Sequence, residues 1–497
     1  MHILSYASRI ASLASRPRLA RWRSNAVKLQ DEEFKKIVKK ARNTDFGRKH
    51  DFENIKGYDS FISRVPVRNY EDFKPYIDRI MKGEKDLLWP GLPKYMAMTS
   101  GTTSGIKYIP ITADSLPNHI NSARYALLMY IGATGNSRFV NGKYIFLSAT
   151  PKLDESGPIP CGRLSGIAHR NVPKFLHSRR LPLYETNCIP NWEEKLDKII
   201  EETVNEKMTL ISGIPPWIQM YFEKLLEHTG KRNILEIFPH FSLLVHGGVN
   251  FQPYEQRMFK LIGKEIDTLE TFPASEGFIA FQDRFPSEGL LLIPDSGIFF
   301  EFIPAESYGE QDPPRIPLSR VELDVNYVLL INSNAGLWGY NIGDTVKFVS
   351  VNPYRLVVTG RISQFTSAFG EHIIEEEADF AIGNAAEMTG AVVSEFTLAP
   401  LVDNPDGKPR HQWFVEFEKV PPDAGLFADR VDNLLREKNS YYSHLVDGRI
   451  IDKAEIISVP EGTFKRYMKS AGKLGGQNKV PHLSNDRKIA EWIFANI

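Results

Sequence analysis

The segment TSGTTSGIKYIP at residues 99–110 combines five serine and threonine hydroxyls, two glycines and one lysine. Backbone N–H groups, hydroxyls and an ammonium suit the oxygens of a phosphate chain. The segment is not a Walker A motif, because three residues separate Gly101 from Gly105 and Lys107 is followed by tyrosine. By itself it is either a phosphate-binding loop or an ordinary turn, placed between a short strand and a helix with an Asp/Ser cap.

Two acidic residues stand where they could serve a nucleotide. Glu276 lies among apolar and small residues in LETFPASEGFIA, where a carboxylate is costly unless it is paired or bound to a metal. It is either a salt-bridged loop glutamate or a Mg²⁺ ligand. Asp344 in LWGYNIGDTVKF either caps a turn between two strands or accepts hydrogen bonds from ribose hydroxyls. Phe272 is either a core aromatic or a flat surface for a purine ring.

Two cations could act with these carboxylates. Lys479 lies in KLGGQNKVPHL, a predicted mobile loop, and taken alone it is a solvated lysine. Arg124 follows the polar loop on a predicted helix and is either a surface arginine or an anchor for a substrate carboxylate. Other motifs are weak. The sequence has no HExxH, CxxC pair or GxSxG, its histidine spacings match no common zinc site, and the glutamates at 375–377 indicate a solvated helix start.

The elements around these residues follow an α/β pattern. Amphipathic helices and short apolar strands alternate between residues 192 and 247, which predicts a parallel sheet with helices on its faces. From about Gly289 the pattern changes to strand–turn–strand around DSG and NAG turns, and a last strand ends at Arg361. A connector and a helix follow, so we predict a domain boundary near 361–366.

Composition excludes several classes of protein. The 497 residues are 42% hydrophobic and 25% charged, and 61 basic residues balance 61 acidic ones. A net charge of zero argues against a whole-chain binder of nucleic acid or anionic membrane. No apolar run approaches the roughly 18 residues of a membrane span. Cys161 and Cys188 lie far apart outside any CxxC pattern, which favours a reducing cytoplasm.

The N-terminal segment is basic and serine-rich, with no acidic residue before Asp31. This composition is that of a transit peptide or of a basic amphipathic helix that caps the fold. We favour the capping helix, because the helical pattern continues through VKLQDEEFKKIVKKA without a break.

The motifs, in this order, resemble those of the auxin-responsive acyl-acid amido synthetases, a branch of the adenylate-forming (firefly-luciferase-like) superfamily. TSGTTSGIKYIP resembles the phosphate loop of that family, FPASEGFIA its second motif and YNIGD its third. NTDFGRKHDF, TGRISQFTSAFGEHI, HQWFVEFE and GGQNKVP extend the resemblance over nearly the whole chain. Asn341 replaces a residue that is more often basic in plant members, and Ser363 replaces a hinge aspartate. With the short chain, these departures place the sequence closer to the bacterial branch.

The resemblance implies an α/β fold with two domains. A large N-terminal domain, residues 1–362, would hold the ATP and acyl-acid site in mixed sheets flanked by helices, with a β-hairpin or barrel-like part. A smaller, mobile α+β domain, residues 363–497, would close over the active site.

The implied activity is ATP-dependent. The enzyme would adenylate a small carboxylic acid and transfer the acyl group to the amine of an amino acid, with ATP and Mg²⁺ as cofactors and without nucleic-acid or membrane partners. Such chemistry requires positioning and charge neutralisation rather than a protein nucleophile. The alternatives are an acyl-CoA-type ligase with a thiol acceptor, and a non-catalytic sensor of a nucleotide or acid on the same fold.

The resemblance also implies roles for individual residues. Lys479 would neutralise charge on the α-phosphate, Glu276 would bind Mg²⁺, and Asp344 would bind the ribose. Arg124 would bind the acyl substrate. The other implied nucleotide-binding residues are Ser100, Gly101, Thr102 and Thr103 at the phosphates, Phe272 at the adenine, and Ser275 and Arg361.

Overall fold

The structure is a computed structural model that describes residues 3–100, 106–148, 150–172, 174–248, 251–310, 312–362, 373–401, 408–447, 451–473, 479–484 and 487–497. The chain forms two compact units. The first comprises Met1–Val249 and Leu261–Val357, and the second comprises Asn250–Lys260 and Val358–Ile497. The second unit therefore includes a short internal segment that the sequence did not assign to it. The domain limits at 362 and 363 stay a prediction.

A twelve-stranded mixed sheet forms the centre of the first unit, and it confirms the α/β class. Its order is β12-β11-β13-β14-β15-β10-β9-β8-β7-β6-β3-β5. The parallel part consists of β3 (Lys143–Phe146), β5 (Arg180–Leu181), β6 (Met208–Gly213), β7 (Leu243–Gly247) and β8 (Asp267–Pro273). The rest consists of β9 (Phe278–Gln282), β10 (Leu290–Leu292), β11 (Ile298–Pro304), β12 (Ile316–Pro317), β13 (Asn326–Ser333), β14 (Tyr340–Val351) and β15 (Tyr354–Arg361), whose last residues belong to the second unit.

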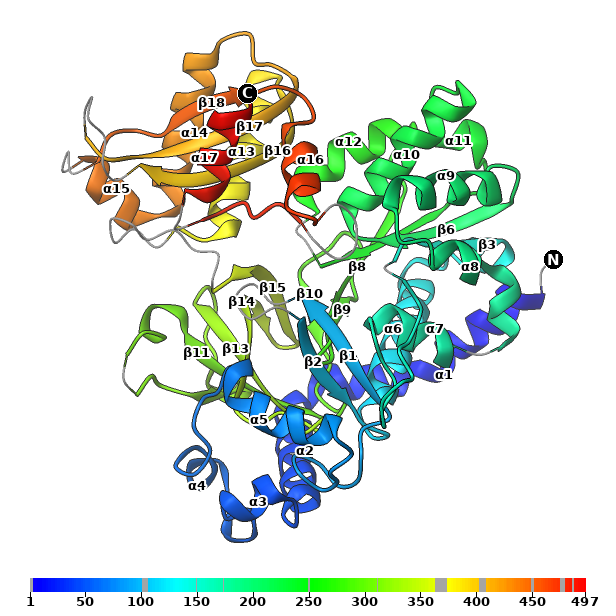
Figure 1. Ribbon diagram of the computed structural model, residues 1–497, viewed down its shortest axis with the longest axis vertical. Helices are drawn as coiled ribbons and strands as arrows, with labels where there is room; N and C mark the ends of the chain where they lie inside the picture. Colours follow the sequence, from blue (N-terminus) through cyan, green and yellow to red (C-terminus); the bar gives the residue numbers. More distant parts are fainter. Residues whose placement is uncertain are drawn as a thin grey trace. The chain divides into compact units, whose positions relative to one another are not determined.

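Helices flank the parallel strands, as predicted (Figure 1). They include α6 (Leu116–Thr134), α7 (Leu164–Asn171), α8 (Tyr184–Asn187), α9 (Trp192–Thr203), α10 (Pro215–Thr229) and α11 (Ile234–Ile237). The predicted stop of α10 at Gly230 is confirmed, because this glycine caps the helix at a φ of 66°. Shorter helices precede the first strand: α3 (Asp45–Lys49), α4 (Tyr58–Ile62) and α5 (Tyr70–Met81). None of the described helices has both the length and the apolar composition that a membrane span requires.

The N-terminal segment is helical and packs on the first unit. α1 (Ile3–Ser24) is followed after one residue by α2 (Ala26–Ala41). Trp22 is 1% exposed, and its indole N–H donates to Asp295 at 2.8 Å. Arg23 pairs with the buried Asp283 at 2.6 Å. α1 is therefore part of the folded unit, as predicted, although the helix is interrupted at Asn25 and not continuous.

One predicted hairpin is correct and one is wrong. β13 and β14 pair antiparallel across the NAG turn, where Gly336 donates to the carbonyl of Ser333 at 2.9 Å. The strands on either side of the DSG turn do not pair with each other. β10 pairs with β9 and β15, whereas β11 pairs with β13 and β12. Both strands are almost wholly buried and apolar apart from Glu301, so their sequences lack the alternation that would specify a neighbour.

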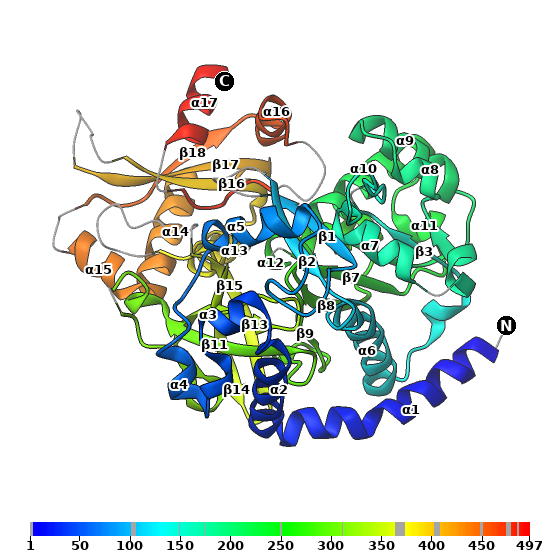
Figure 2. The same ribbon diagram turned by 60° about the horizontal axis from the view of Figure 1, so that its bottom comes forward.

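The second unit is an α+β layer structure around a three-stranded sheet, with the order β16-β17-β18. Its strands are β16 (Val392–Leu401), β17 (Arg410–Lys419) and β18 (Glu455–Val459). α13 (Glu375–Thr389), α14 (Ala424–Lys438) and α15 (Ser440–Asp447) cover one face, and α16 (Thr463–Ser470) and α17 (Lys488–Asn496) cover the other (Figure 2). Neighbouring residues of β17 point into the two cores, since Trp413 belongs to one and Phe414 to the other. Most of α12 (Gln252–Ile262) also belongs to this unit.

A buried ion pair between Glu301 and Arg315 gives a test of the first unit. The two side chains are 0% and 7% exposed, and the guanidinium donates to both carboxylate oxygens, at 2.8 and 2.9 Å. We expect Arg315→Met to lower the free energy of unfolding by about 3–5 kcal/mol, because it leaves Glu301 buried without its cation. Denaturant unfolding measures the change. The double variant Glu301→Gln/Arg315→Met should regain part of the loss, and an unchanged midpoint in the single variant would contradict the prediction.

Candidate active site

The TSGTTSGIKYIP segment forms the two arms of a β-hairpin. β1 (Tyr95–Ser100) pairs antiparallel with β2 (Ile106–Ile111), and Ser100 is opposite Ile106. The predicted passage from the loop directly into a helix is therefore wrong, because β2 intervenes before α6. β2 lies at the edge of the sheet β2-β1-β4, in which β4 is Cys161–Gly162, and Pro110 is tolerated at this edge. Residues 101–105, which include Gly101, Thr102 and Thr103, lie outside the described residues, as does the side chain of Ser100.

The second strand of this hairpin is attached to α5. The backbone N–H of Tyr108 donates to the hydroxyl of Tyr70 at 2.9 Å, and the Lys107 ammonium lies 5.5 Å from the centre of the Tyr70 ring. Tyr70 is 6% exposed and packs in the core of the first unit. A buried side chain therefore holds β2 at the point where the polar loop returns to the sheet.

Glu276 lies on a tight turn just beyond the carboxyl end of β8. Ala274 and Gly277 exchange backbone hydrogen bonds of 2.9 and 3.2 Å, and the turn between them carries Ser275 and Glu276, both partly exposed. Because β8 runs parallel to β7, this is the edge of a parallel sheet at which ligands bind. A partly exposed carboxylate at this edge fits a hard cation such as Mg²⁺. Phe272 is 6% exposed in β8, which is the position of a core aromatic.

Asn118 on α6 fixes this turn, although the sequence did not single it out. Its side-chain amide donates to the carbonyl of Phe278 at 3.0 Å, and its oxygen accepts the Phe278 N–H at 2.6 Å. Asn118 is 6% exposed. A Cβ at Gly277 would lie 2.4 Å from Cδ1 of Ile298, so a larger residue there would require this side chain to shift. The sequence carried no clear signal for this residue, because His119 and Ser122 beside it on the helix are polar and buried as well.

Asp344 lies within a continuous strand and not after a turn between two strands. Leu330 pairs with Asn341 and Val328 pairs with Thr345, so β14 has two extra residues in a bulge that contains Gly343 and Asp344. Gly343 has a φ of 88°, and its N–H donates to the Asn341 side chain at 2.7 Å. Glycine in the left-handed region produces the bulge that the sequence suggested as a turn. The bulge leaves Asp344 partly exposed, as a ribose ligand requires.

The remaining candidates of the first unit differ in position. Arg361 ends β15, as predicted, but its side chain is outside the described part of the structure. Arg124 is exposed on α6, with its guanidinium 5.3 Å from the centre of the Tyr125 ring. This environment is that of a surface arginine, which the sequence left open as one alternative.

The sheet order shows which candidates share a framework. Phe272, Ser275 and Glu276 belong to the β8–β9 region, and Asp344 belongs to β14 of the same sheet, with β10 and β15 between them. The hairpin β1–β2 belongs to a separate sheet of the first unit. Lys479 belongs to the second unit.

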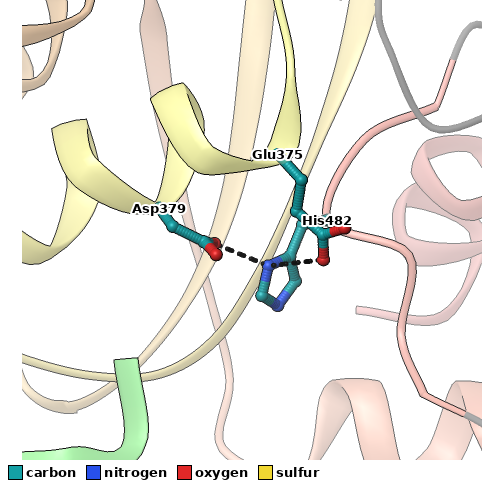
Figure 3. A group of neighbouring side chains, drawn as sticks. All are labelled: Glu375, Asp379 and His482. Carbon is teal, nitrogen blue, oxygen red and sulfur yellow. Dashed lines mark hydrogen bonds and ion pairs between the residues drawn. The ribbon is translucent and has the colours of Figure 1, made fainter. Parts of the chain in front are cut away.

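Lys479 lies beside a buried group of ionisable side chains. Its ammonium is 3.5 Å from Glu375, and its side chain is 24% exposed, so it is not simply a solvated lysine. Figure 3 shows Glu375 and Asp379, one turn apart on α13, facing the ring of His482. Nδ1 of His482 lies 2.8 Å from Asp379 and 3.5 Å from Glu375, and Nε2 lies 3.0 Å from Glu395 on β16.

The interpretation of residues 375–377 as a solvated helix start is wrong for Glu375, which is 6% exposed. The spacing of Glu375 and Asp379 was an available signal, because residues four apart lie on one face of a helix. The missing information was the partner, since His482 is 103 residues beyond Asp379.

The surroundings of His482 favour its protonated form. Complete burial lowers the pKa of His482, but the carboxylates of Asp379 and Glu395 raise it well above the usual value of histidine. Both ring nitrogens then donate. Glu375, Asp379 and His482 also have the composition of a metal site, with ligand atoms within 4.8 Å of one another. A metal ion binds neutral imidazole. Because both nitrogens of the His482 ring lie at hydrogen-bond distance from carboxylates, we interpret the group as a charge cluster and not as a metal centre.

The overall fold is that of the adenylate-forming enzymes. The structural alignment with a GH3.15 acyl acid amido synthetase covers 97% of this chain and 96% of that chain, at a TM-score of 0.77 and 18% sequence identity. A 2-hydroxyisobutyryl-CoA ligase in the postadenylation state, in complex with R3-HIB-AMP, matches 94% of this chain with 91% of its own, at a TM-score of 0.61 and 12% identity.

The chain belongs to the GH3 family. The GH3 family N-terminal domain matches residues 16–171 and 147–266, the central domain matches 291–361, and the C-terminal domain matches 376–488. Two relatives align over most of their length. A jasmonoyl–L-amino acid synthetase, GH3.5 of Oryza sativa subsp. japonica, is 22% identical, and the alignment covers 95% of each chain. An indole-3-acetic acid-amido synthetase, GH3.3 of Arabidopsis thaliana, is 22% identical and covers 94% of this chain and 91% of its own.

These findings confirm the resemblance to amido synthetases that the ordered motifs indicated. Membership of a bacterial branch stays a prediction.

The contact of Asn118 with the turn predicts a specific loss of stability. Asn118→Ala leaves the N–H and carbonyl of Phe278 buried without their partner, which costs about 2–3 kcal/mol. Thermal unfolding should show a lower midpoint. Asn121→Ala, a partly buried position on the same helix, is the matched control and should change the midpoint little. Equal midpoints for the two variants would contradict the role of Asn118.

Proposed function

We propose that this protein is an ATP-dependent acyl-acid amido synthetase, which adenylates a small carboxylic acid and transfers the acyl group to the amine of an amino acid. The observation that carries the proposal is the match of all three GH3 family domains along the chain, from residue 16 to residue 488. The turn with Glu276 at the carboxyl end of β8 supports it, as does the bulge with Asp344 in the same sheet.

The chemistry explains the kind of site that is needed. A carboxylate is a poor acyl donor because its leaving group would be oxide. Attack of a carboxylate oxygen on the α-phosphorus of ATP forms the acyl-adenylate and releases pyrophosphate. Attack of the neutral amine on the acyl carbon then forms the amide, releases AMP and loses one proton. Neither step needs a protein nucleophile, so positioning and charge neutralisation are the tasks of the protein.

The residues present fit ATP with Mg²⁺. Glu276 would hold the ion, which neutralises phosphate charge when bound, and Asp344 would accept the ribose hydroxyls. Ser100, Thr102 and Thr103 would hold phosphate oxygens beside Gly101. Lys479, from the second unit, would neutralise charge that develops on the α-phosphate. The nucleotide, the ion and these assignments are parts of the proposal.

One observation supports a second candidate function. The fold match to a CoA ligase at a TM-score of 0.61 is consistent with an acyl-CoA-type ligase that transfers the acyl group to a thiol. The GH3 C-terminal domain at residues 376–488 favours the amine acceptor. A sensor without catalysis is disfavoured, because it could dispense with the metal ligand at Glu276. We place the protein in the cytoplasm, since ATP is abundant there and both cysteines are free.

The first test is the reaction itself. We expect release of pyrophosphate from ATP that depends on a carboxylic acid, measured across a broad panel of acids. Mass spectrometry of the product, with a mixture of amino acids against CoA, identifies the acceptor. An amide supports the amido synthetase, and a thioester supports the alternative. No release with any acid would contradict both enzymes.

The role of Glu276 gives a second test. Glu276→Gln keeps the size of the side chain and removes its charge, so adenylation should fall more than tenfold, which is about 1.4 kcal/mol of activation free energy. The loss should be largest at low Mg²⁺, and the unfolding midpoint should be unchanged. Glu288→Gln, on the exposed loop after β9, is the matched control, because Glu288 pairs with Arg284 at the surface. A near-normal rate in Glu276→Gln would exclude the proposed role.

A further inference from the structure

The segment that carries Lys479 is attached to β16 by its backbone. Leu398 donates to the carbonyl of His482 at 2.8 Å, and Ser484 donates to the carbonyl of Leu398 at 3.1 Å. The hydroxyl of Thr397 donates to the carbonyl of Pro481 at 2.7 Å. Residues 481–484 thus extend the sheet of the second unit by a short parallel bridge, and Lys479 lies two residues before it.

The side chain of His482 connects this segment to two elements. Its ring stacks on Phe396 of β16 at a centroid distance of 4.1 Å, and its nitrogens lie at 2.8 Å from Asp379 and 3.0 Å from Glu395. Since His482 is 6% exposed, water does not compete for these contacts. One ring therefore joins α13, β16 and the 479–484 segment.

The charges around the ring favour the imidazolium form of His482. Glu375 and Asp379 face it from α13, Glu395 faces it from β16, and the Tyr254 hydroxyl of α12 lies 3.4 Å from Glu395. The cation on the same segment is Lys479, 3.5 Å from Glu375. A neutral His482 would leave three carboxylates with one ammonium in a largely buried space, which is unfavourable.

We infer that His482 is a positioning residue. Held between Asp379 and Glu395, it fixes the 479–484 segment to the second unit. The attachment keeps the Lys479 ammonium beside Glu375, which orients it. This inference rests on the proposed function, in which Lys479 serves the adenylation step. His482 itself does not contact a substrate in this scheme. It acts through the backbone that Lys479 shares with it and through the carboxylates around it.

The first part of the test measures the attachment without using activity. Hydrogen–deuterium exchange of the full chain is compared for the wild type, His482→Gln and Asp379→Asn. We expect at least tenfold faster exchange in peptides that contain Leu398 and residues 481–484, because the cluster that holds them has lost a charge. Asp432→Asn is the matched control. Asp432 is a buried aspartate on the adjacent α14 that binds Ala454 and Tyr442, so its loss should not affect these peptides.

The second part measures whether the attachment acts through Lys479. We expect His482→Gln to slow acid-dependent pyrophosphate release at least tenfold, with the loss in kcat rather than in KM for ATP. Lys479→Ala should do the same. The double variant should be no slower than Lys479→Ala alone, because residues that act as one unit are not additive. A purely structural role for His482 would add a further loss in the double variant.

The outcomes separate the two levels of the proposal. Unchanged exchange in His482→Gln, or a normal rate, overturns the positioning role. A stoichiometric divalent metal that is present in the purified wild type and lost in His482→Gln also overturns it, since a metal ligand must be neutral. A wild type that exchanges as expected but adenylates no acid contradicts the proposed function and the role of Lys479 there. In that case the exchange data still show whether His482 attaches the 479–484 segment to the second unit.

Discussion

Charges that leave water need partners of opposite charge, and for two buried aspartates of this protein the partners come from distant parts of the chain. Asp283 is 0% exposed at its side chain and pairs with Arg355 at 2.7 Å and with Arg23, which is 260 residues away. Asp379 pairs with His482 across 103 residues. Each pair stabilises a particular arrangement, because removal of one partner leaves an uncompensated buried charge. These contacts attach the N-terminal helix to the large sheet and the C-terminal segment to the small one.

The candidate active site depends on backbone geometry as much as on side chains. A tight turn presents Glu276, and Asn118 from a distant helix fixes the strand that follows it. A two-residue bulge with Gly343 presents Asp344. In both places regular strand pairing is interrupted beside a candidate carboxylate, which is left partly exposed. Such interruptions explain why glycines accompany both acidic residues in the sequence.

The comparisons show how much of the fold survives at low identity. The match to a solved amido synthetase has a TM-score of 0.77 at 18% sequence identity. Burial patterns and turn residues specify the backbone, and many side chains satisfy the same pattern. A pocket for an acyl group would depend on the particular side chains of several elements. The jasmonoyl and indole-3-acetic acid activities therefore describe the relatives, while the shared adenylation chemistry is what we propose for this chain.

The sequence by itself predicted the α/β class, the parallel strands with their helices, the end of α10 at Gly230 and the family, because these depend on local periodicity, turn residues and the order of motifs. It did not predict the pairing of β10 and β11, since strands that are buried on both faces lack the alternation that specifies neighbours. It also missed the role of Asn118 in fixing the turn, since its partner Phe278 is 160 residues away in the chain. The burial of Glu375 was missed for the same reason, because His482 is 107 residues away. Periodicity reports which face of an element is buried, and only the tertiary structure decides which distant group meets that face. For this reason Lys479, a solvated lysine by composition, has a buried glutamate as its neighbour.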